Sequence, residues 1–332
     1  MTKHLIYIDT TRAILITLVV LGHVLNYANP QYNVIPYTLA QEFINAFHMP
    51  AFFLLSGLLT DGEKWRSRPI DAYFVHKART LLIPYLFFEC LALLYKHFVL
   101  HSVSFTEGLR LMLTIHCNVG ADWFLPAMFL ACALYYLYIR SPRRIVWGVG
   151  GAALLLGLRF LMSAGAGYWR VLLFRGVLGF VFMLAGNLLK KPLTEFKWWK
   201  IVCAFLLTAA TSAIYLKFSL GNSFYDAVLR TPVLYLISGV CGLYFVMGIA
   251  HLIPWKWPAK IGENTLTIMG THQLVLYTLP GDSNLLWVLG VTCLIAIVET
   301  VLILTINRFC PVLVGKGRKE FSDVRNKTTN RV

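Results

Sequence analysis

Long apolar runs recur along almost the whole chain and are separated by short polar segments. A helix that crosses the hydrocarbon core of a bilayer needs about 20 mostly apolar residues. The pattern predicts helices of this kind at residues 11–28, 45–60, 80–100, 123–139, 145–163, 170–189, 199–216, 229–253, 262–280 and 284–307. We therefore expect an all-α integral membrane protein with about ten transmembrane helices.

The composition supports this fold class. Of the 332 residues, 58% are hydrophobic and 14% are charged, and the mean hydropathy is +0.66. A soluble domain carries roughly a quarter charged residues. A chain this apolar cannot cover itself with a polar surface, so a bilayer has to be its solvent.

The charge distribution predicts the orientation of the chain. It holds 30 Lys and Arg against 15 Asp and Glu, a formal net charge of +15. The basic residues concentrate in every second loop, at 61–79, 140–144, 190–198 and 254–261, and again after the last apolar run. Because cytoplasmic loops are enriched in Lys and Arg, we expect cytoplasmic N- and C-termini and a multi-pass protein of the plasma (inner) membrane. No separate basic stripe exists, so we expect no nucleic-acid partner.

The domain organisation is expected to be simple. Residues 1–310 form one transmembrane domain, and residues 311–332 form a basic cytoplasmic tail that is disordered and lies near anionic membrane lipid. The seven cysteines lie mostly inside apolar runs, and none has metal-ligand spacing, so no metal is expected. The Walker, GxSxG and HExxH motifs of ATP-driven and common hydrolytic enzymes are missing.

Polar residues interrupt the first apolar run. Asp9 lies three residues before Arg12, so the two side chains can pair. Arg12 lies eleven residues before His23, which places both on one helix face about 16 Å apart along the axis. Asn26 follows His23 on the same stripe. Ionisable residues at membrane depth are functional candidates; the alternative is a structural polar interface in which Arg12 only anchors the topology.

Other candidates lie near the ends of later helices. His48 opens the second helix, and Pro50 suits its first turn. Asp122 and Trp123 enter the fourth helix, where they either hold a sugar by hydrogen bond and ring stacking or belong to the aromatic belt of the membrane interface. His272 lies within the ninth helix. The candidate substrate-binding residues are therefore His48, Asn26, Asp122, Trp123 and His272.

Several arginines form a basic rim on the predicted cytoplasmic side, among them Arg79, Arg68 and Arg144. Most such residues serve topology alone. A phosphate-bearing cofactor would nevertheless require one or two fixed arginines, because the guanidinium group binds phosphate in a bidentate manner.

These motifs resemble those of a known family. The resemblance is carried by Asp9, by Arg12 with His23, and by the run Phe47-His48-Met49-Pro50 with Ser56-Gly57. They are similar to the acyltransferase 3 family of membrane O-acyltransferases, and more narrowly to its fucose 4-O-acetylase-like branch, over about residues 5–307. Weaker matches are Arg79 with Pro84, Trp123-Phe124-Leu125, and Gly262 with Thr265 and His272. Asn264-Thr265 departs from a more frequent serine but keeps a hydroxyl.

The resemblance implies an enzyme that moves an acyl group, usually acetyl, from cytoplasmic acyl-CoA to a hydroxyl of a surface-glycan or lipid-linked sugar. It implies that His23 is the catalytic histidine and that Arg12, beside Asp9, is its motif partner. The basic rim of Arg79, Arg68 and Arg144 would then face the CoA phosphates. A neutral His23 is suited to general-base catalysis, and a covalent acyl-histidine is the alternative.

Two other functions stay open at this point. The first is a proton-coupled transporter or flippase of a sugar-lipid precursor, which would use intramembrane His and Glu residues as relays. Transporters often contain two similar halves, and no internal repeat is visible here. The second is a non-catalytic membrane partner of a glycan assembly complex.

Overall fold

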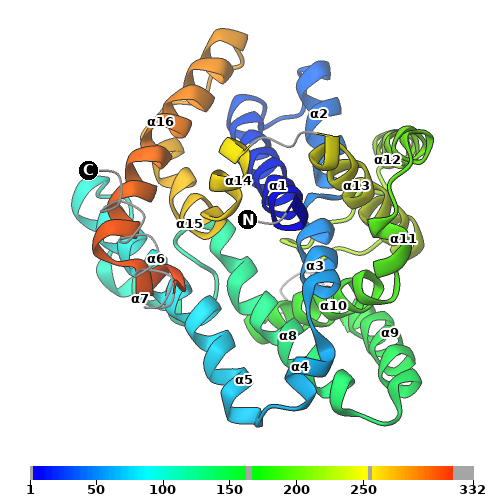
Figure 1. Ribbon diagram of the computed structural model, residues 1–332. Coiled ribbons are helices and arrows are strands. Elements are labelled where there is room, and N and C mark those ends of the chain that lie inside the picture. The colour runs from blue at the N-terminus through cyan, green and yellow to red at the C-terminus, as the bar shows by residue number, and fades with distance from the viewer. Residues whose placement is uncertain (1–2, 162–166, 253–255, 317–332) are drawn as a thin grey trace, which may run out of the picture.

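The computed structural model describes residues 3–161, 167–252 and 256–316, and these residues form helices and connecting loops without a β-strand (Figure 1). The helices are α1 (Lys3–Ala28), α2 (Ile35–Asn45), α3 (His48–Leu59), α4 (Gly62–Arg66), α5 (Ile70–Lys77), α6 (Ile83–Leu94), α7 (Phe105–Leu113), α8 (Phe124–Arg140), α9 (Arg144–Leu161), α10 (Tyr168–Leu188), α11 (Lys190–Thr194), α12 (Trp198–Phe218), α13 (Pro232–Leu252), α14 (Lys256–Gly262), α15 (Thr265–Leu276) and α16 (Leu285–Phe309). Short π-helical turns at Ala78–Leu82 and Tyr95–Val99 and 3-10 turns at Gly120–Trp123 and Pro311–Val314 extend some of them.

Eight helical segments of the described chain are long and apolar enough to cross a membrane. They are Ile6–Ala28, Ile35–Leu59, Ile70–Val99, Gly120–Arg140, Tyr168–Leu188, Trp198–Phe218, Pro232–Leu252 and Leu285–Phe309. The predicted all-α integral membrane fold is therefore confirmed. The two remaining predicted spans are not among them: α9 has only a shorter apolar stretch at Ile145–Leu158, and the 262–280 segment contains the break between α14 and α15.

The second membrane segment differs from its prediction. It begins at Ile35 instead of residue 45 and is broken between α2 and α3, just before His48. A break frees backbone carbonyls that have no water to bind at this depth. The Ser238 hydroxyl of α13 donates a hydrogen bond of 2.7 Å to the Ala46 carbonyl and so satisfies one of them. Pro50 lies in the first turn of α3, as its missing N–H predicts.

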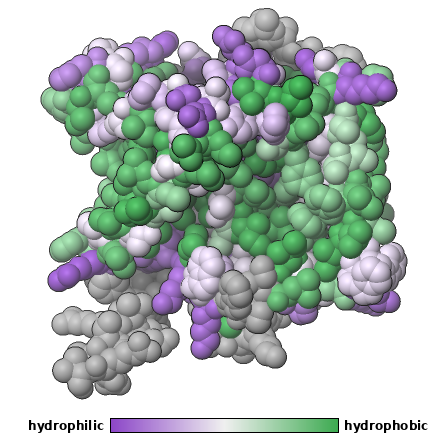
Figure 2. Space-filling view, turned by 90° about the horizontal axis from the view of Figure 1, so that it is seen from above, coloured by the Kyte–Doolittle hydropathy of each residue, from purple (hydrophilic) through white to green (hydrophobic). Residues whose placement is uncertain are grey.

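The helices separate into a polar-containing centre and an apolar periphery. Figure 1 shows α1 near the middle of the bundle, with α16 and α12 at opposite edges. In the most apolar stretch of the segment that contains α8, 72% of the residues are buried. In the corresponding stretch of α16, only 22% are buried. Figure 2 shows a broad band of hydrophobic surface with hydrophilic residues above and below it. This band has the character of a lipid-facing surface.

Glycines allow close contact between α3 and α10. A Cβ atom at Gly57 would lie 1.9 Å from the Met183 carbonyl oxygen, and one at Gly186 would lie 2.0 Å from that of Leu54. Backbone therefore touches backbone at two successive turns of this antiparallel pair. Small residues are the usual means of close helix packing in bilayers, where no hydrophobic force acts between the helices.

Segments near both ends of the described chain pack against the region where α14 ends and α15 begins. Gly262, at the end of α14, packs against the backbone of Asp9 in α1, where a Cβ would lie 1.7 Å from the carbonyl oxygen. The Lys316 ammonium group donates hydrogen bonds to Asn264 and Asn307. Residues 311–316, the first part of the expected tail, are packed: Val314 is buried against Phe88. The rest of that tail lies outside the described residues.

Replacing Gly186 by Ala is expected to destabilise the bundle by about 1–3 kcal/mol, because the new methyl group overlaps the α3 backbone. Thermal unfolding in detergent measures the effect. Gly150→Ala in α9 is the matched control, since no heavy atom lies within 4 Å of the added methyl group. Equal unfolding temperatures for the two variants would contradict the close α3–α10 contact.

Candidate active site

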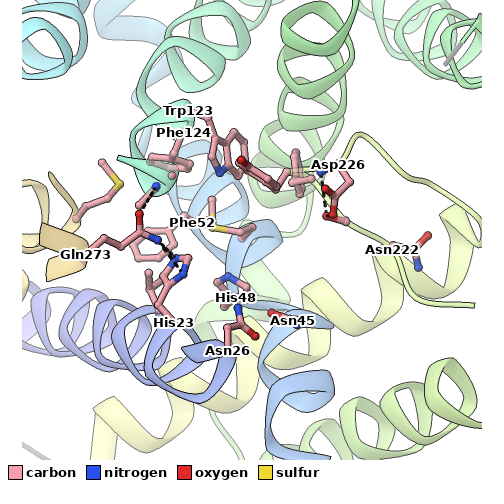
Figure 3. A pocket seen from close by; sticks show the side chains of 18 of the residues that line it. His23, Asn26, Asn45, His48, Phe52, Trp123, Phe124, Asn222, Asp226 and Gln273 are labelled. Carbon is pink, nitrogen blue, oxygen red and sulfur yellow. Dashed lines mark hydrogen bonds between the residues drawn. The ribbon is translucent and has the colours of Figure 1, made fainter. Parts of the chain in front are cut away.

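A cavity of about 650 Å³ lies between α1, α2, α3, α8, α13 and α15 and beneath the loop at 219–231. His23, Asn26, His48 and Trp123, four of the predicted site residues, line it (Figure 3). Its lining on α1 runs from Ile16 to Tyr27, which is about 16 Å along the helix axis. The two histidines and the asparagine predicted from sequence therefore share one cavity.

His23 is held from α15. The side-chain Nε2 of Gln273 lies 2.9 Å from Nδ1 and 3.1 Å from Nε2 of the imidazole. The ring of His272, also on α15, lies behind it with the ring centroids 5.2 Å apart. His272 is fully buried, does not line the cavity, and places its Nδ1 2.6 Å from the Ile268 carbonyl oxygen. The structure therefore places His272 against His23 and not in the cavity.

A chain of amides fixes the orientation of Asn26. The Oδ1 atom of Asn29 accepts the backbone N–H groups of Asn33 and Val34, both at 3.0 Å, so its Nδ2 must be the group that donates to Gln41 Oε1. Gln41 Nε2 then donates to Asn26 Oδ1 over 2.7 Å. With its oxygen engaged in this way, Asn26 is left to offer N–H groups to the contents of the cavity.

His48 is fixed in a similar way by the break between α2 and α3. Its Nδ1 lies 2.7 Å from the Ile44 carbonyl oxygen, which can only accept, so Nδ1 carries the hydrogen. The Nε2 atom of the neutral ring is then a hydrogen-bond acceptor. Neither His48 nor Asn26 is hydrogen-bonded to His23 within the described structure.

The outer end of the cavity is polar and aromatic. Tyr32, which is 45% exposed, lies at this end with Glu42 and Asp226. Partial burial, reinforced by the two carboxylates, raises the pKa of the Tyr32 phenol, so that the hydroxyl stays protonated and can donate a hydrogen bond at neutral pH. The inner end is apolar, because buried side chains such as Ile16, Val19 and Met269 form it.

The loop at 219–231 forms the outer wall of the cavity. Phe224 is buried and stacks on Phe53, with ring centroids 5.1 Å apart, and on Trp123, at 5.9 Å. Arg175 of α10, which is only 7% exposed, donates to the backbone carbonyls of Phe224 and Tyr225. Its guanidinium group also lies 4.7 Å from the ring centroid of Trp123. The buried Arg175 thus stabilises the loop by hydrogen bonds and holds the Trp123 ring by a cation–π contact.

Asp122 lies behind this wall. It is fully buried beside Glu89, and it does not line the cavity. Glu89 accepts the backbone N–H groups of Asn118 and Val119 at 2.7 and 3.1 Å and thereby shapes the turn that leads into Trp123. The Asp122 carboxyl therefore lies behind the aromatic wall and does not face the cavity.

The predicted pair at the start of α1 is present. Arg12 Nη1 lies 2.9 Å from Asp9 Oδ1. Neither residue lines the cavity, which begins one turn later at Ile16. Asp9 also carries the backbone contact with Gly262, so the Arg12 end of α1 is fixed against α14.

None of the three arginines of the predicted rim lines the cavity. Arg79 is exposed on the π-helical turn at Ala78–Leu82. Arg68 is exposed and lies over the Trp65 ring at 5.6 Å. The side chain of Arg144 lies outside the described residues. Among the described residues, no group of three or more His, Cys, Asp or Glu side chains could hold a metal ion.

Sequence reasoning missed several residues of this site. Gln273 was passed over in favour of its neighbour His272, although a polar side chain at membrane depth is itself a signal. Arg175 and Glu299 are ionisable residues inside apolar runs, and the sequence alone does not identify their partners. Arg175 binds the 219–231 loop, and Glu299 accepts the Thr271 hydroxyl at 2.8 Å. The partners of Arg175 and of Glu299 are therefore far from them in the sequence.

The fold and the cavity define a multi-pass membrane protein with a histidine-bearing cavity between its helices. The chain belongs to the acyltransferase 3 family, because the family model, described as an acyltransferase domain, matches residues 5–307. It is similar to nodulation protein NolL of Mesorhizobium japonicum, with 30% identity over 148 residues, which are 44% of this chain and 39% of the nodulation protein. No solved structure matches the chain. The chain is thus a membrane protein of this family, as the resemblance implied.

Replacing Arg175 by Met is expected to loosen the 219–231 loop, because the Phe224 and Tyr225 carbonyls lose their donor. Hydrogen bonds to a charged group contribute about 1.5–3 kcal/mol each. Limited proteolysis should cut this loop faster in the variant. Arg170→Met, which removes an exposed arginine of the same helix, is the control and should leave the cleavage rate unchanged. Equal rates in both variants would show that Arg175 does not hold the loop.

Proposed function

We propose that this protein transfers an acetyl or other short acyl group from acyl-CoA to a hydroxyl of a surface-glycan or lipid-linked sugar, with His23 as general base. The observation that carries the proposal is the cavity itself. In a chain of the acyltransferase 3 family, it joins His23 to a wall of hydrogen-bonding and aromatic side chains. Sugars are bound by such a combination of polar groups and ring faces, because they present both hydroxyls and apolar C–H surface.

The chemical step needs one base and one leaving group. His23 takes the proton of the acceptor hydroxyl, whose oxygen forms a bond to the acyl carbon of the thioester. The carbon–sulfur bond then breaks, and the thiolate that leaves takes the proton from His23. General-base assistance of this kind is worth about 10²–10⁴ in rate.

The polar end of the cavity is suited to the acceptor. Asn26 offers N–H groups, His48 offers a lone pair, and Trp123 lines the cavity with a ring that Arg175 and Phe224 hold in place. The acyl group would occupy the apolar inner end near Ile16. Acyl-CoA would approach from the side of the basic rim, which we assign to the cytoplasm of a plasma (inner) membrane protein with cytoplasmic termini.

Replacing His23 by Ala is expected to reduce acyl transfer by a factor of about 10²–10⁴ while the protein still folds. Mass spectrometry of surface glycans from cells with and without the protein measures the added acyl mass. His101→Ala removes an exposed histidine in a loop remote from the cavity and should leave the transfer unchanged. A His23→Ala strain that makes the normal product would end the assignment of the base.

Replacing Arg79 by Ala is expected to raise the KM for acyl-CoA several-fold with little change in kcat, since a phosphate contact far from the reacting carbon contributes to uniform binding. Arg79→Lys should have a smaller effect, because it keeps the charge but loses bidentate contact. Lys190→Ala removes another exposed basic residue and serves as the control. An unchanged KM in Arg79→Ala would remove this residue from the donor site.

A further inference from the structure

The side-chain amide of Gln273 has a fixed orientation. Its Oε1 accepts the backbone N–H of Ala121 at 3.2 Å and the phenol of Tyr277 at 3.1 Å. Tyr277 in turn accepts the backbone N–H of Gly120. A backbone N–H can only donate, so the oxygen must face Ala121 and the amino group must face the cavity and His23.

The surrounding backbone enforces this arrangement. Ala121 and Gly120 belong to the 3-10 turn at Gly120–Trp123, so their N–H groups are held by a turn and not by a mobile side chain. A Cβ at Gly120 would lie only 3.1 Å from Gln273 Oε1. Gln273 itself is 5% exposed and lines the cavity. Its amino group is therefore a rigid donor in a nearly dry environment.

Acyl transfer creates a need for a donor at this place. When the acceptor oxygen attacks the thioester, the carbonyl electrons move to the carbonyl oxygen, which becomes an oxyanion. Enzymes stabilise that charge with pre-organised N–H groups, including those of Asn and Gln side chains. The base and the oxyanion donor must both lie about 3 Å from the reacting group, and Gln273 Nε2 already lies within 3.1 Å of the His23 ring.

We propose that Gln273 is a catalytic residue that donates its side-chain N–H to the acyl carbonyl oxygen as negative charge develops there. One N–H of this amide donates to a ring nitrogen of His23. The acceptor hydroxyl displaces it, so that the imidazole takes the hydroxyl proton while the freed N–H of the fixed amide donates to the oxyanion. Collapse of the intermediate restores the carbonyl, breaks the carbon–sulfur bond and passes the proton from His23 to the thiolate. The inference rests on the proposed function of His23.

Two substitutions separate catalysis from structural support. Gln273→Leu keeps the volume and removes every hydrogen bond. Gln273→Glu keeps an oxygen for Ala121 and Tyr277 but presents a second acceptor in place of the donor. We expect both to lower kcat by about 100- to 1000-fold with little change in the KM for acyl-CoA.

The test is acyl transfer by the purified, full-length protein, with acetyl-CoA as the donor probe and surface glycan from cells that lack the protein as the acceptor. Thermal unfolding confirms that each variant is folded. Tyr244→Phe is the structural control, because it removes a partly buried hydrogen bond of 2.8 Å to the Glu195 carbonyl, remote from the cavity. It should keep its kcat.

The outcomes distinguish the two proposals. An inactive wild-type protein would contradict the proposed function and this inference with it. An active wild type, an inactive His23→Ala variant and a Gln273→Glu variant with normal kcat would contradict the inference alone. A Gln273→Glu variant that is as stable as the wild type but loses kcat would support a role in catalysis rather than in folding.

Discussion

Backbone N–H groups at two reversals of the chain determine which hydrogen-bonding groups face the cavity. Inside a bilayer-embedded protein no bulk water can exchange with a misplaced amide, so each buried polar group must find its partner in the protein. The Asn33 and Val34 N–H groups fix Asn29, then Gln41, then Asn26. The Ala121 N–H fixes Gln273 at the opposite wall. In both cases a backbone N–H, which can only donate, determines the donor and acceptor roles along the whole chain of hydrogen bonds.

The helix breaks are subject to the same constraint, because their freed backbone groups also need partners in the protein. Non-helical backbone at membrane depth is tolerated where it lines a cavity or finds partners in the protein. The α2–α3 break places His48 on the cavity and leaves a carbonyl that Ser238 satisfies. The α14–α15 break allows Gly262 to meet the Asp9 backbone while α15 carries Gln273 to His23. The breaks therefore bring His48 and Gln273 to the cavity that His23 lines, and at the first break Ser238 satisfies a freed carbonyl.

The sequence predicts those features that depend on local periodicity. Apolar runs predict the long helices, the three-residue spacing predicts the Asp9–Arg12 pair, and the positions of His23 and His48 predict a shared site. Features that depend on distant partners are not predictable in this way. The choice between His272 and Gln273 depends on which face of α15 meets α1.

The outer wall of the cavity shows the same limit. Arg175 is visible in the sequence as a costly charge in an apolar run, but its partners are backbone carbonyls 49 and 50 residues away. Main-chain acceptors leave no signature in the residue types of the loop. For the same reason Asp122 looks like a ligand for a sugar, because nothing in its neighbourhood reveals that Glu89 lies beside it.

The contrast between the two ends of the cavity bears on a problem that every acyltransferase faces, since water competes with the acceptor hydroxyl for the thioester. A closed, apolar environment around the reacting carbon suppresses that side reaction. Here the inner end is lined by buried side chains such as Ile16 and Met269, and the polar groups gather at the outer end. His23 lies where the polar end of the cavity meets the apolar end. An acceptor would reach a base at this place only by displacing water from the polar end. The acceptor's own binding contacts would then decide whether its hydroxyl or water reaches the acyl carbon.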